Sequence, residues 1–96
     1  MNNLDELIRA AKNSFVEIDA AYQAADINEK LVMAEKRNKA ADQLIALQAK
    51  RLIRNASAIT DADITEMKNL KDRIDDAAQI QTALLQFVGL LAKFVG

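Results

Sequence analysis

The chain has 96 residues, a net charge of −1, and no cysteine, histidine or proline. The missing cysteine and histidine exclude disulfides, a thiolate nucleophile and the commonest metal ligands, and the small net charge provides no global field toward nucleic acid or anionic lipid. Strong helix formers, among them alanine, leucine, glutamine, lysine and glutamate, dominate the composition. The sequence therefore predicts a single all-α domain spanning residues 1–96.

The first predicted helix covers about residues 4–25. Apolar side chains recur along it at alternating spacings of four and three: Leu4, Ile8, Ala11, Phe15, Ile18, Tyr22 and Ala25. This spacing indicates one apolar face on a helix. Asn3 is placed to cap the helix, and Asp5 and Glu6 lie near its positive N-terminal end.

The second predicted helix covers about residues 28–55. Its seam has the same spacing: Ile27, Leu31, Ala34, Asn38, Ala41, Ile45, Gln48 and Leu52. This seam is rotated by roughly 140° from the first, and Asp26 with Glu29 fits a capping box, so we expect a break near residues 26–28. The alternative is a long helical hairpin in which the first two helices are continuous, because Met33, Ala40, Leu44 and Leu47 roughly extend the first seam.

The third predicted helix covers about residues 61–95. The segment NASAITDAD precedes it, and Thr60 with Asp63 forms a weaker capping box. Its heptad-type seam consists of Met67, Leu70, Ile74, Ala77, Gln81, Leu84, Val88, Leu91 and Val95. The three helices together predict a small three-helix bundle with coiled-coil-like seams.

Charge is divided among these segments. Residues 1–26 have two basic and five acidic side chains, residues 27–56 have seven and three, and residues 57–96 have four and six, giving −3, +4 and −2. We expect the basic helix to pack between its acidic neighbours. The possible partner-facing basic surface consists of Lys36, Arg37, Lys39, Lys50, Arg51 and Arg54. Nucleic acid is not the expected partner, because this helix has no aromatic residues for base stacking.

The C-terminal segment 79–96 has one charged residue, Lys93. On a helical wheel its apolar side chains fill an arc of roughly 220°, whereas a helix docked in a bundle needs about 100°. The excess predicts burial combined with a homo-oligomer interface. The expected interface residues are Gln81, Leu84, Leu85, Phe87, Val88, Leu90, Leu91, Phe94 and Val95.

Gln81 falls at a core position of its seam. A polar core residue can set register and oligomer number by pairing with its symmetry mate. The alternative is a long side chain that reaches water at the edge of the seam. Asn38 and Gln48 invite the same two interpretations.

A peripheral membrane protein that uses residues 79–96 is the alternative function. The uninterrupted apolar stretch 83–96 spans only about 21 Å of helix, too short for a roughly 30 Å hydrocarbon core. Flat binding at the headgroups remains compatible with the pattern, although the polar face has a single lysine. The N-terminus has no signal-peptide apolar region, so the cytoplasm is the default location, with export by a route without a cleavable signal left open.

No pattern of catalytic residues is present. Residues 61–72 superficially resemble a calcium loop, but Glu66 stands where the turn needs glycine, so we expect an acidic first helical turn. Asp72, Asp75 and Asp76 are expected to form a solvated face. We predict neither an enzyme nor a cofactor or metal site, but a self-associating protein–protein interaction module acting as an adaptor, chaperone or assembly component, with RNA binding a weaker alternative.

Overall fold

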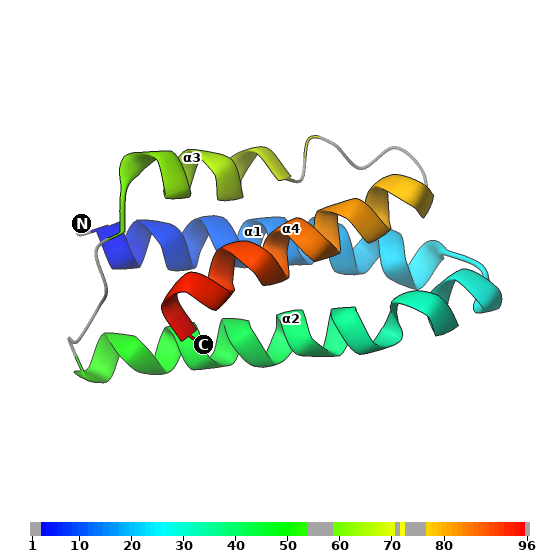
Figure 1. Cartoon of the computed structure of the whole chain (residues 1–96), viewed down its shortest axis with the longest axis horizontal. Helices are drawn as coiled ribbons and strands as arrows, with labels where there is room; N and C mark the ends of the chain where they lie inside the picture. The colour runs from blue at the N-terminus through cyan, green and yellow to red at the C-terminus, as the bar shows by residue number, and fades with distance from the viewer. Residues whose placement is uncertain (1–2, 54–58, 71, 73–76, 96) are drawn as a thin grey trace.

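The computed structural model describes residues 3–53, 59–70, 72 and 77–95, which contain four α-helices and no strand. Helix α1 spans Asn3–Ala24, α2 Ile27–Ile53, α3 Asp61–Leu70 and α4 Ala77–Val95. They run alternately up and down in a bundle with extents of 40, 21 and 17 Å (Figure 1). The predicted all-α bundle is confirmed.

The boundary between α1 and α2 is a tight turn closed by a helix cap. The Asp26 carboxylate accepts a hydrogen bond from the backbone N–H of Glu29 at 2.9 Å, and the N–H of Ala25 donates to the carbonyl oxygen of Tyr22 at 3.1 Å. The cap supplies a partner for a free N–H at the start of α2. The predicted break at residues 26–28 is therefore confirmed, and the alternative of one continuous helix is wrong.

The start of α3 has the capping box predicted from Thr60 and Asp63. The backbone N–H of Asp63 donates to Oγ1 of Thr60 at 3.2 Å, and the N–H of Thr60 donates to Oδ2 of Asp63 at 3.0 Å. The two residues thus satisfy each other's free donors. Asp61 and Asp63 lie in the first turn of α3, as the interpretation of residues 61–72 as an acidic helical turn requires.

The prediction of one helix over residues 61–95 is wrong, because the structure has α3 and α4 in its place. A continuous helix of that length would measure about 52 Å, whereas the 22 residues of α1 span about 33 Å. Much of its apolar side would extend past the other helices into water. Reversing the chain between α3 and α4 brings the apolar residues of both against α1.

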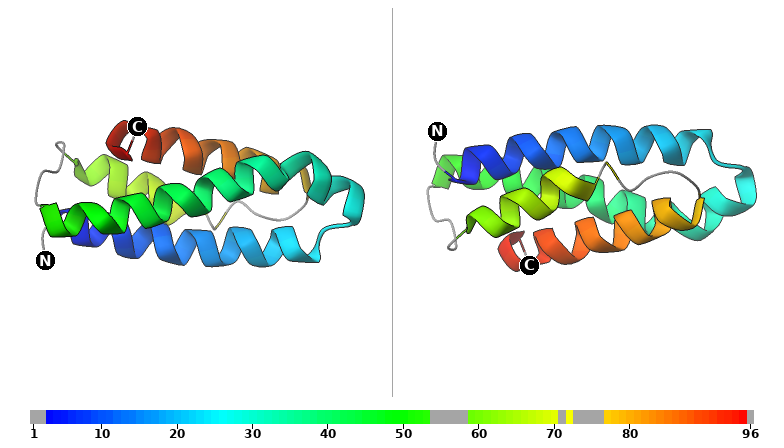
Figure 2. Two further views of the ribbon diagram at one scale, coloured as in Figure 1. Left: turned by 90° about the horizontal axis from the view of Figure 1, so that it is seen from below. Right: turned by 90° about the horizontal axis from the view of Figure 1, so that it is seen from above.

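The four helices differ in how many of the others they pack against. Helix α1 packs against all three others, and α4 also packs against all three, whereas α2 and α3 lie at opposite corners and do not touch within the described residues. The pairs α1 with α3 and α2 with α4 run in the same direction (Figures 1 and 2). Among the described helices, α1 and α4 therefore cover α2 and α3 does not.

Helix α1 buries two adjoining faces. The predicted seam is buried or half-buried along its length, and Leu7, Ala10 and Ser14 are buried beside it. Ser14 donates from Oγ to the carbonyl oxygen of Met67 in α3 at 2.5 Å. The predicted cap residue Asn3 instead donates from its side-chain amide to the carbonyl oxygen of Ile59 at 2.7 Å, which ties the start of α1 to the segment before α3.

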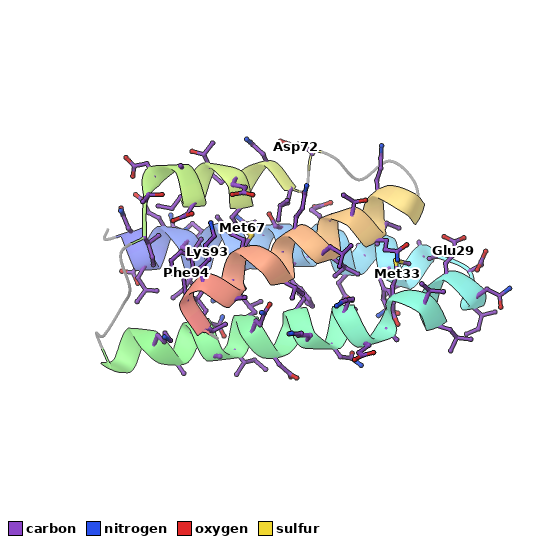
Figure 3. All side chains as sticks on the ribbon, viewed as in Figure 1. Glu29, Met33, Met67, Asp72, Lys93 and Phe94 are labelled. Atoms are coloured by element: carbon purple, nitrogen blue, oxygen red, sulfur yellow. The ribbon has the colours of Figure 1, made fainter. Side chains whose placement is uncertain are left out.

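The core face of α4 is shifted by one residue from the predicted seam. Its buried side chains include Ile80, Leu84, Phe87, Leu91 and Phe94, spaced 4, 3, 4 and 3, while Gln81 is exposed. The rings of Phe87 and Phe15 lie with centroids 5.9 Å apart. Met67 of α3 and Met33 of α2 are buried in the same core (Figure 3). Gln81 therefore lies outside the core of the single chain.

The face of α2 that enters the core also differs from the predicted one. Met33, Ala40 and Leu47 are buried, and Leu44 packs against the core. Gln43 joins them and donates from Nε2 to the carbonyl oxygen of Val88 in α4 at 3.1 Å. In the sequence, Met33, Ala40, Leu44 and Leu47 favour the alternative of a continuous helix. In the structure they form the buried face of a separate α2.

Candidate interaction surface

The predicted oligomer interface on α4 is largely enclosed by the chain itself. Six of its nine residues are buried: Leu84, Phe87, Val88, Leu90, Leu91 and Phe94. Val95 is half-buried, Gln81 is exposed, and Leu85 is the one large apolar side chain of the set that remains exposed, at 50%. The argument that one chain cannot cover this apolar arc is wrong.

The reason is the number of neighbours that α4 has. The expected excess in the roughly 220° arc assumes a helix held by only two neighbours, which needs an apolar arc of about 100°. In the bundle α4 contacts α1, α2 and α3. The break before α4 allows α3 to pack against it as a third neighbour. The wrong prediction of one helix over residues 61–95 therefore accounts for both the three-helix bundle and the predicted interface on the tail.

The outward side of α2 has the apolar surface that α4 lacks. We call it the outer seam, and its described members are Ile27, Leu31, Ala34, Asn38, Ala41, Ile45 and Gln48. Ile27 is 67% exposed, Leu31 71% and Ile45 65%, whereas Ala34, Ala41 and Gln48 are half-buried. These are the described residues of the predicted second seam. They lie on one side of α2, as the periodicity predicts, but that side faces away from the core.

Helical geometry separates the outer seam from the core. At about 100° per residue it lies roughly 130° around α2 from Met33, Ala40 and Leu47. In the view of Figure 2 (left), α2 runs along the front of the bundle with α1 on one side and α4 on the other. No other described helix covers this side, so the outer seam lies on the solvent side of α2 along about six helical turns, from Ile27 to Gln48.

Charged side chains border the outer seam with opposite sign on its two sides. Lys30 and Arg37 lie on the side nearer α1, and Glu35 and Asp42 lie on the other side. Glu35 and Asp42 are exposed and form no ion pair with the described residues. The outer seam thus has an apolar centre, one basic border and one acidic border.

Arg37 joins the basic border to α1. Its Nε lies 2.8 Å from Oδ1 of Asp19, and its guanidinium carbon lies 5.5 Å from the ring centroid of Phe15. The hydrogen bond from Arg37 holds the pKa of Asp19 below its usual value. Arg37 also donates to Oδ1 of Asn38 at 3.2 Å, so it contacts the outer seam directly.

One described member of the predicted basic surface, Arg37, is turned away from the others. Lys36 and Lys39 are exposed, Lys50 is half-buried, and Arg37 turns toward α1 to pair with Asp19. The side chain of Arg51 and the whole of Arg54 lie outside the described residues. The expected packing of basic α2 beside acidic α1 is present in the Arg37–Asp19 pair, while α2 and acidic α3 do not touch within the described residues.

The described residues contain no group of three His, Cys, Asp or Glu side chains placed to hold a metal ion. Asp72 is exposed, and Asp75 and Asp76 lie outside them. None of the helices they form is long and apolar enough to cross a membrane. Comparison with family models, curated proteins and solved structures finds no match for the chain.

The outer seam was visible in the sequence, but its location was not. Two 4–3 patterns overlap on α2, and periodicity alone does not say which one a bundle buries. Composition does not separate them either. The outer seam includes Asn38 and Gln48, but the inner 4–3 pattern passes through Arg37, and the buried face also takes in Gln43.

Proposed function

We propose that the chain is a non-catalytic protein–protein interaction module, an adaptor, chaperone or assembly component, that binds its partner through the outer seam of α2. The supporting observation is the exposure of Ile27, Leu31 and Ile45 on a helix whose opposite side is packed in the core. Large apolar side chains grouped on one face and bordered by charges are typical of a protein-binding surface. The default cytoplasmic location is part of this proposal.

The form of the surface favours a helical partner. An apolar stripe with 4–3 spacing is recognised by another helix or by a groove that receives a helix. Helix α2 is held in place by α1 and α4, so its shape is set before binding and little conformational entropy is lost. The charged borders give such a partner orientation as well as affinity.

The two alternatives receive less support from the fold. Membrane binding through residues 79–96 would need the apolar side chains of α4, and Leu84, Phe87 and Leu91 are fully buried in the bundle. RNA binding would need the cationic residues of α2 to act together, and Arg37 is engaged by Asp19. We therefore place binding on the outer seam.

Site-specific photo-crosslinking tests the proposal. A photoreactive amino acid replaces Leu31 in the outer seam or, as the matched control, exposed Asn69 on α3. In cells of the native host, residue 31 is expected to give discrete protein adducts and residue 69 none. Equal labelling at both positions, or no protein adduct at residue 31, would contradict it. Co-sedimentation with anionic vesicles that is lost on truncation at residue 78 would favour the membrane alternative.

A further inference from the structure

We propose that the partner of the outer seam is a second copy of this chain, and that two α2 helices pair in parallel and in register as a two-stranded coiled coil. The inference rests on the proposed function, because it names the occupant of the same surface. Three independent features of α2 support it: its heptad pattern, the sign of its bordering charges and the position of Asn38.

The heptad pattern defines which residues face the partner. Spacings of four and three place Leu31, Asn38 and Ile45 at a positions and Ile27, Ala34, Ala41 and Gln48 at d positions. The described part of the seam covers three heptads, about 33 Å of helix. Alanine at two d positions allows two helices to approach closely, while Leu31 and Ile45 provide the exposed apolar contacts.

The bordering charges select the direction of pairing. In this heptad Lys30 and Arg37 occupy g positions, and Glu35 and Asp42 occupy e positions. In a parallel coiled coil each g residue meets the e residue five positions later in the partner. Lys30 therefore meets the partner copy's Glu35. Arg37 keeps its Nε–H on Asp19 and meets the partner copy's Asp42 with a guanidinium N–H that neither Asp19 nor Asn38 uses. Both pairs have opposite charges.

An antiparallel pair would have the reverse electrostatics. Antiparallel helices bring g positions opposite g positions and e positions opposite e positions. The described g positions are Lys30, Arg37 and Leu44, and the e positions are Asn28, Glu35, Asp42 and Ala49. No acidic residue stands at g and no basic residue at e, so an antiparallel pair gains no pair of opposite charges at these positions in any register, whereas the parallel pair gains two.

Asn38 fixes the register. It lies at the central a position of the described seam and is exposed to solvent in the single chain. In a parallel, in-register dimer the two copies of Asn38 meet, and each amide finds a polar partner of matching geometry. The hydrogen bond from Arg37 to Oδ1 of Asn38 leaves the amide N–H groups of Asn38 available for this contact.

Sedimentation of the full chain tests the dimer and the seam. Between about 1 and 500 μM the weight-average mass is expected to rise from 10.6 kDa toward twice that value. Leu31→Lys should raise the dissociation constant at least tenfold. Val32→Lys is the matched control, because Val32 is 67% exposed but lies outside the seam, and it should leave the dissociation constant within about threefold. Circular dichroism at the lowest concentration checks that both variants stay folded.

Charge reversal tests the direction. Glu35→Lys should weaken the parallel dimer, and adding Lys30→Glu should restore it, because the pair is regained with its signs exchanged. In an antiparallel dimer that places residue 35 opposite the partner copy's Asp42, Glu35→Lys would strengthen association. In addition, Asn38→Cys places the only thiol of the chain at the centre of the seam. Mild oxidation is expected to link two copies covalently through residue 38, whereas Asn69→Cys on α3 should give no disulfide-linked dimer in denaturing electrophoresis.

The outcomes separate this inference from the proposed function. A chain that stays at 10.6 kDa throughout the range, yet crosslinks to a different protein from residue 31, overturns self-pairing and keeps the interaction module. A monomer without adducts at residue 31 overturns both. A dimer insensitive to Leu31→Lys, or one strengthened by Glu35→Lys, overturns the parallel α2 coiled coil.

Discussion

The guanidinium of Arg37 in α2 donates from Nε to Oδ1 of Asp19 in α1 at 2.8 Å, and both side chains are about a quarter exposed. This pair joins the two helices beside the outer seam. Partly exposed ion pairs are worth about 0.5–1 kcal/mol, because solvent screens them and the side chains lose conformational entropy. We expect a double-mutant cycle of Asp19→Asn with Arg37→Gln to give a coupling free energy of that size in urea unfolding at low protein concentration.

Arg37→Lys distinguishes the contribution of the charge of Arg37 to stability from that of its contact with the Phe15 ring. Lysine keeps the positive charge but loses the planar contact over the Phe15 ring, so it should recover only part of the lost stability. Raising the salt concentration from about 0.05 to 0.5 M should reduce the coupling. A coupling near zero at low salt would show that the pair sets helix position without stabilising the fold.

The neighbouring residues Leu84 and Leu85 test the corrected orientation of α4. Leu84 is fully buried, whereas Leu85 is 50% exposed. Leu84→Ala removes core contacts and leaves a cavity, so it should lower the free energy of unfolding by about 2–5 kcal/mol. Leu85→Ala should cost no more than about 1 kcal/mol. Equal effects in urea denaturation would place α4 in a different rotation from the one described.

The sequence predicted what depends on short-range chemistry. The caps at Asp26 and Thr60 formed as expected, because a capping box involves residues only three positions apart. The seam of α1 was also predicted, since its 4–3 pattern has no apolar competitor of equal strength. These features follow from local hydrogen bonding and from one unambiguous periodicity.

The sequence did not predict what depends on the number of neighbours. The break between α3 and α4 is decided by apolar contacts with α1, which lie far away in the chain. Without that break the tail has only two neighbouring helices, too few to cover its apolar arc, so the pattern predicts an interface from residues that the bundle buries. The rotation of α2 was ambiguous for the same reason, since two seams competed and only the assembled bundle selects one.

Substitutions of Gln43 measure how its buried side-chain amide affects the stability of the core between α2 and α4. Its Nε2 donates to the carbonyl oxygen of Val88 at 3.1 Å, while its Oε1 is buried without a hydrogen-bond partner in the described structure. An unpaired buried acceptor costs free energy. Gln43→Leu removes it at similar volume and should leave the free energy of unfolding unchanged or raise it by about 1 kcal/mol.

Gln43→Ala is the matched comparison for that substitution. It also removes the amide but leaves space between the helices, so it should cost about 1–3 kcal/mol. Thermal and urea unfolding of the three chains give the order leucine, then wild type, then alanine. If leucine is less stable than alanine, the amide makes a net favourable contribution through contacts that outweigh its unpaired oxygen.

The carboxylate of Asp63 makes the stability of the α3 cap depend on pH. The backbone N–H of Thr60 donates to its carboxylate, and Lys93 of α4 lies 3.6 Å away (Figure 3 labels Lys93). The hydrogen bond from Thr60 is the main cause that holds the pKa of Asp63 below its usual value. A carboxylate with a lowered folded-state pKa contributes stability above its unfolded pKa, near 4, and this contribution disappears as pH falls through the folded pKa.

Asp63→Asn should therefore change the shape of the acid response. The variant is expected to lose about 0.5–1 kcal/mol at pH 7, because the asparagine lacks the charge that favours a helix N-terminus. The urea midpoint of the wild type should fall below about pH 4, partly through Asp19 and Asp26, whose pKa values are also lowered. The two curves should converge near pH 2, after Asp63 is protonated.

Asp61→Asn, in the same helical turn, is the control and should follow the wild type more closely. Parallel curves for Asp63→Asn and wild type down to pH 2 would show that the ionised carboxylate does not stabilise the start of α3.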